Sequence, residues 1–163
     1  MPTYKADLSV SSLDELLRSV NAYKTKLEAA PVKIVSELAE IGRNEIQANI
    51  NGITDKDGNY LAVAGEFTFG GTGFAFMQGE QAGFLEYGTG VQGQSSPHPQ
   101  ASQAGWNYNS GKTIHVKTGS WAYWDPARGR HVWTNGIPAQ MPVLRAALAM
   151  RRKIREVAKG ALI

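Results

Sequence analysis

The chain has 163 residues and a mass of 17.7 kDa, which suits one hydrophobic core and is short for two domains. It contains no cysteine, and this excludes a disulfide framework and every thiolate metal site. No window approaches about 18 uninterrupted apolar residues, so neither a signal peptide nor a membrane span is expected. We therefore predict a single domain over residues 1–163 that resides in the cytoplasm.

Charge is distributed unevenly along the chain. Residues 1–60 carry seven positive and nine negative side chains, and residues 61–111 carry none positive and three negative. Residues 112–163 carry ten positive side chains and two negative ones. The net charge of +3 is therefore the sum of an acidic body and a basic end. This asymmetry indicates a binding partner more than it indicates a fold.

The first predicted element is helical and covers residues 12–51. Ser12-Leu13-Asp14-Glu15 has the form of a capping box, which marks a helix start. A stripe of 3.6-residue period follows, formed by Leu13, Leu16, Leu17, Val20 and Leu27. Pro31 either kinks one long helix or begins a second one. A further stripe, Val35, Leu38, Ile41, Gly42 and Ile46, leads to an end near Asn51-Gly52.

Residues 57–137 form the predicted strand and loop region. Twelve of the 18 glycines lie within residues 58–111. Period-two alternation around a glycine-rich turn predicts a β-hairpin with one aromatic face, made of Phe67, Phe69, Phe74 and Phe76. Further short strands are predicted over residues 83–87, 112–117, 121–124 and 131–134. Residues 88–110 show neither period and are predicted to form a long loop.

The last predicted element is an amphipathic helix over residues 143–160. The order helix, strands, helix predicts an α+β fold. We expect an N-terminal helical segment, an antiparallel sheet of about five to six short strands, and the C-terminal helix packed on that sheet.

The last predicted helix is strongly basic. Its cations include Arg151, Arg152 and Arg155. Basic residues in the last turns complement the helix macrodipole and also suit a solvated face. Arg145 lies at the helix start, where a positive charge is unfavourable, so the macrodipole does not explain the whole set. Contact with DNA phosphates or with an acidic partner therefore stays open.

No motif predicts a cofactor, a metal or a catalytic residue. Gly88-Thr89-Gly90-Val91-Gln92-Gly93 spells a dinucleotide fingerprint, but the prolines at positions 97 and 99 make the required helix improbable. The three histidines are spaced by 17 and 16 residues, with no carboxylate at a ligand-like offset, so solvated or hydrogen-bonded imidazoles are expected. No hydroxyl nucleophile shows local activation. These motifs therefore contain no sign of a catalytic site.

Tryptophan is concentrated in one part of the chain. All four tryptophans lie within 28 residues, from Trp106 to Trp133. Alternation places Trp121 and Tyr123 on one strand face and Trp124 on the other. These side chains suit core packing or interface anchors. A glycan-binding module, or a small cell-wall hydrolase that uses the Trp/Tyr cluster, remains the alternative function.

Two segments resemble a known family. Gly83-Phe84-Leu85-Glu86-Tyr87-Gly88-Thr89-Gly90 resembles the A-x-x-x-E-[FY]-G-T signature of the gene-product-ten-like tail components of long-tailed siphophages. These are also described as head-tail joining, neck or tail-completion proteins. The segment from Trp133 to Leu148 looks like the family's closing G-x-P-[AP]-x-P-F-[LM]-x-P-A-L, with Val143 in place of Phe and Ala146 in place of the second Pro.

The resemblance implies a structural virion protein without catalysis. Such a subunit forms a homo-oligomeric ring at the neck, assembled in the host cytoplasm. Its partners would be tail-tube or tail-terminator proteins and head connector proteins, with non-specific contact to packaged DNA and none to membrane. Glu86 is then a candidate for an inter-subunit or buried ion pair with a basic residue of the last third, and Gly88 would permit a sharp turn. The expected interface residues are Glu86, Tyr87, Gly88, Thr89, Trp121, Trp124, Arg151, Arg152 and Arg155.

Overall fold

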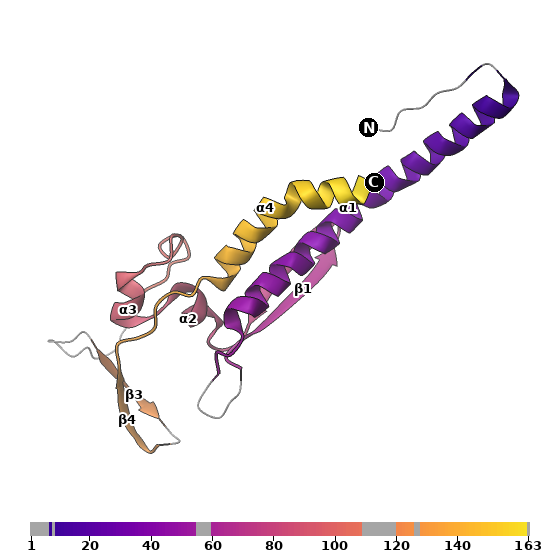
Figure 1. Cartoon of the computed structure of the whole chain (residues 1–163). Helices are drawn as coiled ribbons and strands as arrows, with labels where there is room; N and C mark the ends of the chain where they lie inside the picture. Colours follow the sequence, from indigo (N-terminus) through magenta and orange to yellow (C-terminus); the bar gives the residue numbers. More distant parts are fainter. Residues whose placement is uncertain (1–6, 8, 55–59, 109–119, 126–127, 163) are drawn as a thin grey trace.

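A computed structural model describes residues 7, 9–54, 60–108, 120–125 and 128–162. These residues form four helices and four strands, and the predicted α+β class is confirmed (Figure 1). In chain order the elements are α1 (Val10–Ile50), β1 (Val63–Phe69), β2 (Thr72–Gln78), α2 (Ala82–Tyr87), α3 (Gly90–Ser95), β3 (Trp121–Asp125), β4 (Arg130–Thr134) and α4 (Pro142–Leu162).

Helix α1 is one continuous helix of 41 residues, roughly 60 Å long at 1.5 Å per residue. The sequence left open whether Pro31 lies within one long helix or begins a second one. The structure shows one long helix, with Pro31 inside it. It begins earlier than predicted. The Ser9 side chain, and not that of Ser12, occupies the N-cap and accepts from the Ser12 amide at 3.3 Å. At the other end the Asn51 amide donates to the Gln47 carbonyl at 2.9 Å. The helix ends at Ile50, so the predicted end near Asn51 is confirmed.

Strands β1 and β2 form the predicted hairpin, which lies along the C-terminal half of α1. The two strands are antiparallel, with Phe67 opposite Phe74. The hairpin approaches α1 through small residues. A Cβ built on Gly73 would lie 3.3 Å from the Cβ of Ala39, and one on Gly42 would lie 2.6 Å from the Cβ of Ala75. Small residues on both elements therefore allow the helix and the hairpin to touch closely.

Helix α4 packs along α1 and also contacts β2, so the predicted packing of the C-terminal helix is confirmed. Its bounds match the prediction within two residues at each end. The core lies where α1, the hairpin, α2 and the start of α4 meet. It consists of Ile46, Ile50, Ala62, Leu85 and Ala146.

The sheet differs in detail from the prediction. In the part of the chain that the structure describes, the strands form two separate two-stranded antiparallel sheets, β1-β2 and β3-β4. Residues 83–87 form helix α2 and not a strand, and the predicted loop 88–110 contains helix α3. The predicted strand 112–117 lies outside the described residues. In an element of six residues, the spacing of apolar residues fits either a helix or a strand. Contacts with neighbouring elements then determine which of the two forms.

Candidate functional site

Helix α2 and the start of α4 meet at the carboxylate of Glu86. Glu86 is only 7% exposed. Its Oε2 accepts from the Val143 amide at 2.8 Å and its Oε1 from the Leu144 amide at 3.0 Å. These amides belong to the first turn of α4, where backbone N–H groups lack a partner within the helix. A buried carboxylate on α2 therefore caps a helix that begins 56 residues later.

The sequence around the start of α4 explains why this cap comes from another element. Pro142 is the first residue of the helix and has no amide hydrogen. Met141, which precedes it, carries no side-chain hydroxyl or carboxylate and has a positive φ of 57°. The helix therefore lacks a local N-cap, and the negative charge of Glu86 also suits the positive end of the macrodipole.

His98 is the second partner of Glu86. Its Nε2 lies 3.0 Å from Glu86 Oε1, and the residue is 3% exposed. The Gln100 amide donates to His98 Nδ1 at 3.0 Å, so Nδ1 carries no proton. The neutral tautomer with a proton on Nε2 satisfies both contacts, and Nε2–H donates to the carboxylate.

The resemblance implied an inter-subunit or buried ion pair between Glu86 and a basic residue of the last third. The inter-subunit pair stays a prediction, and in place of the buried pair the structure shows other contacts. Among the described residues, the partners of Glu86 are instead two backbone amides and the imidazole of His98. Three hydrogen bonds to the carboxylate make its burial tolerable without a cationic partner.

Tyr87 lies in a cluster of aromatic rings beside this carboxylate. Its ring stacks on Trp106 with centroids 5.1 Å apart and meets His98 edge-on at 4.8 Å. Phe84 meets Trp106 edge-on, with ring centroids 5.8 Å apart. Trp106 Nε1 donates to the Gly88 carbonyl at 3.0 Å. Tyr87 is therefore held by neighbours within the subunit, although part of its surface remains exposed.

Gly88 and Thr89 join the end of α2 to the segment that leads into α4. Gly88 has φ 76°, and a Cβ there would lie 2.7 Å from the Ala139 nitrogen, so the sharp turn expected of this glycine is present. The Thr89 amide donates to the Ile137 carbonyl at 2.8 Å, and Thr89 Oγ1 accepts from the Ile137 amide at 3.1 Å. Residues 85–93 and 135–144 thus form one unit, which we name the motif junction.

The tryptophans are divided between two places. Trp121 is half-buried and faces Gly90 of the motif junction, where a built Cβ would lie 3.1 Å from its Cζ3. Trp124 and Trp133 are more than half exposed. Both occupy the same face of the β3-β4 hairpin, because Trp124 is opposite His131 and Trp133 is opposite Ala122. The predicted alternation of Trp121 and Trp124 between strand faces is confirmed.

The basic residues of α4 form a separate surface. Arg151, Arg152 and Arg155 are all exposed. The helix buries Ala146, Ala149 and Val157, and at 100° per residue the three arginines lie on the opposite side. The structure does not bring them to the motif junction, which lies at the first turn of α4.

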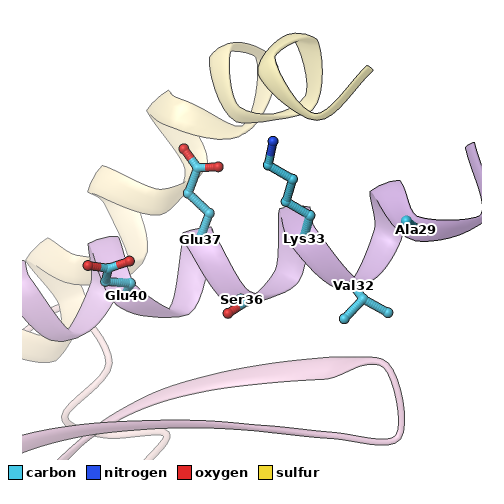
Figure 2. Close-up of a pocket in the computed structure, with 6 residues that line it drawn as sticks. All are labelled: Ala29, Val32, Lys33, Ser36, Glu37 and Glu40. Atoms are coloured by element: carbon cyan, nitrogen blue, oxygen red, sulfur yellow. The ribbon is translucent and has the colours of Figure 1, made fainter. Parts of the chain in front are cut away.

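An open hollow lies along α1 close to the end of α4 (Figure 2). Figure 2 shows Lys33 and Glu37 pointing toward α4, and Val32 pointing toward the hairpin. The hollow is lined by one positive and two negative side chains and by smaller residues, namely Lys33, Glu37, Glu40, Ala29, Val32 and Ser36. Over the described ranges, no group of three or more histidine or acidic side chains is placed to hold a metal ion. In the same residues, no helix is both long and apolar enough to cross a membrane.

Comparison with protein-family models, with curated proteins and with solved structures finds no match to this chain. The sequence analysis did not identify His98 as a partner of Glu86, nor the amides of α4. The sequence does contain one indication that the start of α4 is capped by a distant residue. Gln140-Met141-Pro142 opens a helix without an N-cap residue, which requires a cap from elsewhere in the chain.

Proposed function

We propose that this protein is a structural virion protein of the neck of a long-tailed bacteriophage. In this role it forms an oligomeric ring that joins or completes the tail at the head-tail interface. The observation that carries the proposal is the amount of apolar surface that one subunit leaves uncovered. Leu17 on α1 and Phe69 on the hairpin are 60% and 79% exposed, and exposed apolar patches of this kind mark interaction surfaces.

The motif junction supports the choice of family. The two segments that resemble the tail components are about 50 residues apart in sequence and form one hydrogen-bonded unit. Among the described residues, the hydrogen bonds of the Glu86 carboxylate hold α2, His98 and α4 together. This chemistry is structural, and the proposed role includes no catalysis.

The basic face of α4 supplies the contact proposed for DNA. Arg151, Arg152 and Arg155 project from an exposed helix surface, and phosphate contacts need positive charge with little sequence information. Head connector proteins and tail-tube or tail-terminator proteins are the proposed protein partners. Assembly would take place in the host cytoplasm, and the mature location would be the virion.

Native mass spectrometry tests this proposal directly. The protein is measured alone, mixed with tail-tube protein, and mixed with connector protein. We expect a homo-oligomer of defined subunit number and a complex with at least one of the two phage proteins. A protein that stays monomeric and binds neither partner contradicts the proposal.

A glycan-binding module or small cell-wall hydrolase is the second candidate. It is favoured by Trp124 and Trp133, which share an exposed face of the β3-β4 hairpin and resemble a platform for sugar rings. Tryptophan fluorescence titrated with peptidoglycan fragments or chitooligosaccharides tests it. A saturable shift that is lost in Trp124→Ala supports this candidate, and an unchanged spectrum at millimolar ligand excludes it.

A further inference from the structure

The N-terminal half of α1 presents an apolar face that nothing in the described subunit covers. No residue from 10 to 29 is buried, and Figure 1 shows this half of the helix extending beyond the other elements. We name its apolar stripe the open helix face. Its members are between 41% and 60% exposed, and they are Leu13, Leu17, Val20 and Leu27.

The β1-β2 hairpin presents a second uncovered apolar face. Gly73 and Ala75 point toward α1, so alternation places the phenylalanines on the opposite side. Phe67 stacks on Phe74 with centroids 4.6 Å apart. We name this side the outer hairpin face. Its phenylalanines are between 36% and 79% exposed, and they are Phe67, Phe69, Phe74 and Phe76.

The open helix face continues the side of α1 that already packs on a hairpin. Leu17 precedes Val35 by 18 residues, which is about five full turns at 3.6 residues per turn, so both lie on one side of the helix. The side chain of Val35 lies 2.8 Å from the Cβ position of Gly73 on β2. The same stripe therefore packs on the inner face of the hairpin in one half of α1 and is uncovered in the other half.

We propose that the open helix face of one subunit packs on the outer hairpin face of a second copy of this chain. The lengths agree, since residues 10–29 span roughly 30 Å as a helix and a strand of seven residues spans about 24 Å. The hairpin would then lie between its own α1 and the α1 of its neighbour, as a sheet covered by helices on both sides.

The chemistry of the two faces matches. The outer hairpin face carries no charged side chain, because Glu66 is on the inner side, where its carboxylate lies 3.4 Å from Arg43 Nε. At 100° per residue, the open helix face itself contains one cation, Lys24, between Val20 and Leu27. Its ammonium lies 3.8 Å from the Glu28 carboxylate. Packing of the apolar stripe therefore requires this long side chain to extend to the solvent at the edge of the contact. At the exposed fractions of their eight apolar residues, the two faces leave roughly 800 Å² uncovered. With the residues at the rim included, one contact approaches the about 1,200 Å² of a specific interface.

One contact of this kind covers both faces, whereas pairing of two open helix faces leaves the phenylalanines in water. The contact joins unlike surfaces. Two subunits can exchange both faces in a two-fold dimer, or each subunit can supply one face to one neighbour and the other face to the next; the proposed ring requires the second arrangement. Repetition of such a contact closes into a ring or extends as a filament. The contact between the two faces is argued from the structure alone. Its closure into a ring at the neck rests on the proposed function.

Cysteine cross-linking tests this contact, because the chain has no cysteine of its own. Val20→Cys and Phe67→Cys are made in separate proteins of different mass, mixed, and oxidised mildly. We expect the mixed disulfide between the two proteins as the main product. Ala22→Cys, exposed on the opposite side of the helix, is the matched control and should give little product with Phe67→Cys. A disulfide only between two Val20→Cys chains, or no mixed product, overturns the proposal.

Charge substitutions provide a second measurement. Leu17→Glu and Phe69→Glu should each weaken the apparent affinity between subunits, measured by light scattering, by at least tenfold. Neither substitution should change the thermal unfolding temperature of the single subunit appreciably. Oligomers that persist in both variants overturn the contact. The proposed neck function can fail separately from this contact. In that case the mixed disulfide forms, but native mass spectrometry finds no complex with tail-tube or connector protein.

Discussion

The two halves of α1 share one apolar periodicity and have opposite surroundings. In the C-terminal half, Ile46 and Ile50 are almost fully buried against the hairpin and α4. In the N-terminal half, Leu17 occupies an equivalent position on the helix and is 60% exposed. The comparison teaches that a 3.6-residue stripe predicts which side of a helix is apolar, but not which element or which chain covers it.

The two halves also differ in what stabilises them. The C-terminal half gains free energy from burial, which is the main source of helix stability in proteins. The N-terminal half depends on local interactions within the subunit. These include the Ser9 cap and the exposed pair Lys24 to Glu28 at 3.8 Å, which contribute little by comparison.

The largest expected effect is the loss of the Ile46 side chain. Ile46→Ala removes a fully buried group and should lower the free energy of unfolding by about 2–5 kcal/mol. Leu17→Ala is the matched variant in the other half, and at low protein concentration it should change the same quantity by less than about 0.5 kcal/mol. Urea denaturation measures both. Equal losses would show that the N-terminal half is already covered within the subunit.

Glu86→Ala should have the next largest effect. It leaves the Val143 and Leu144 amides and His98 without their shared acceptor, so we expect a loss of about 3 kcal/mol in unfolding free energy. Glu80→Ala, at an exposed acidic position two residues before α2, should be nearly neutral. Thermal unfolding measures both variants. If Glu86→Ala instead weakened oligomers and left subunit melting unchanged, the carboxylate would act between subunits.

The sequence predicts the long periodic elements of this fold and few of its short ones. The long helices and the β1-β2 hairpin are predicted because a regular stripe spans many residues. Residues 83–87 are predicted as a strand because five positions fit either period. Their helical state depends on distant partners, namely the α4 amides that Glu86 caps. His98 was expected to be solvated or hydrogen-bonded, but sequence spacing contains no information about its contact with Glu86.

Gly88→Ala should have an intermediate effect. The substitution combines a positive φ with a Cβ that would lie 2.7 Å from the Ala139 nitrogen, and we expect a loss of about 2–3 kcal/mol. Gly105→Ala has a similar φ of 65° and open space around the Cβ, so it should cost only about 1 kcal/mol. Chemical denaturation of the two variants separates backbone strain from the close approach at the motif junction. Equal losses would mean that the junction relaxes around a methyl group.

The smallest expected effect lies at the start of α1, in the half without burial. Hydrogen bonds from the Ser9 hydroxyl and the Ser9 amide lower the pKa of Asp7 from its ordinary value of 3.8. Because the pKa is lowered in the folded state, the stabilisation of the helix start is present above the unfolded pKa and is lost as pH falls through the lowered value. A titration followed by the Ser9 and Ser12 amide shifts should therefore have its midpoint below 3.8. Asp7→Asn should remove this step and leave the amides around Ile46 unaffected, because the two halves of the helix are stabilised separately. A midpoint at or above 3.8 would contradict the bonds to Ser9.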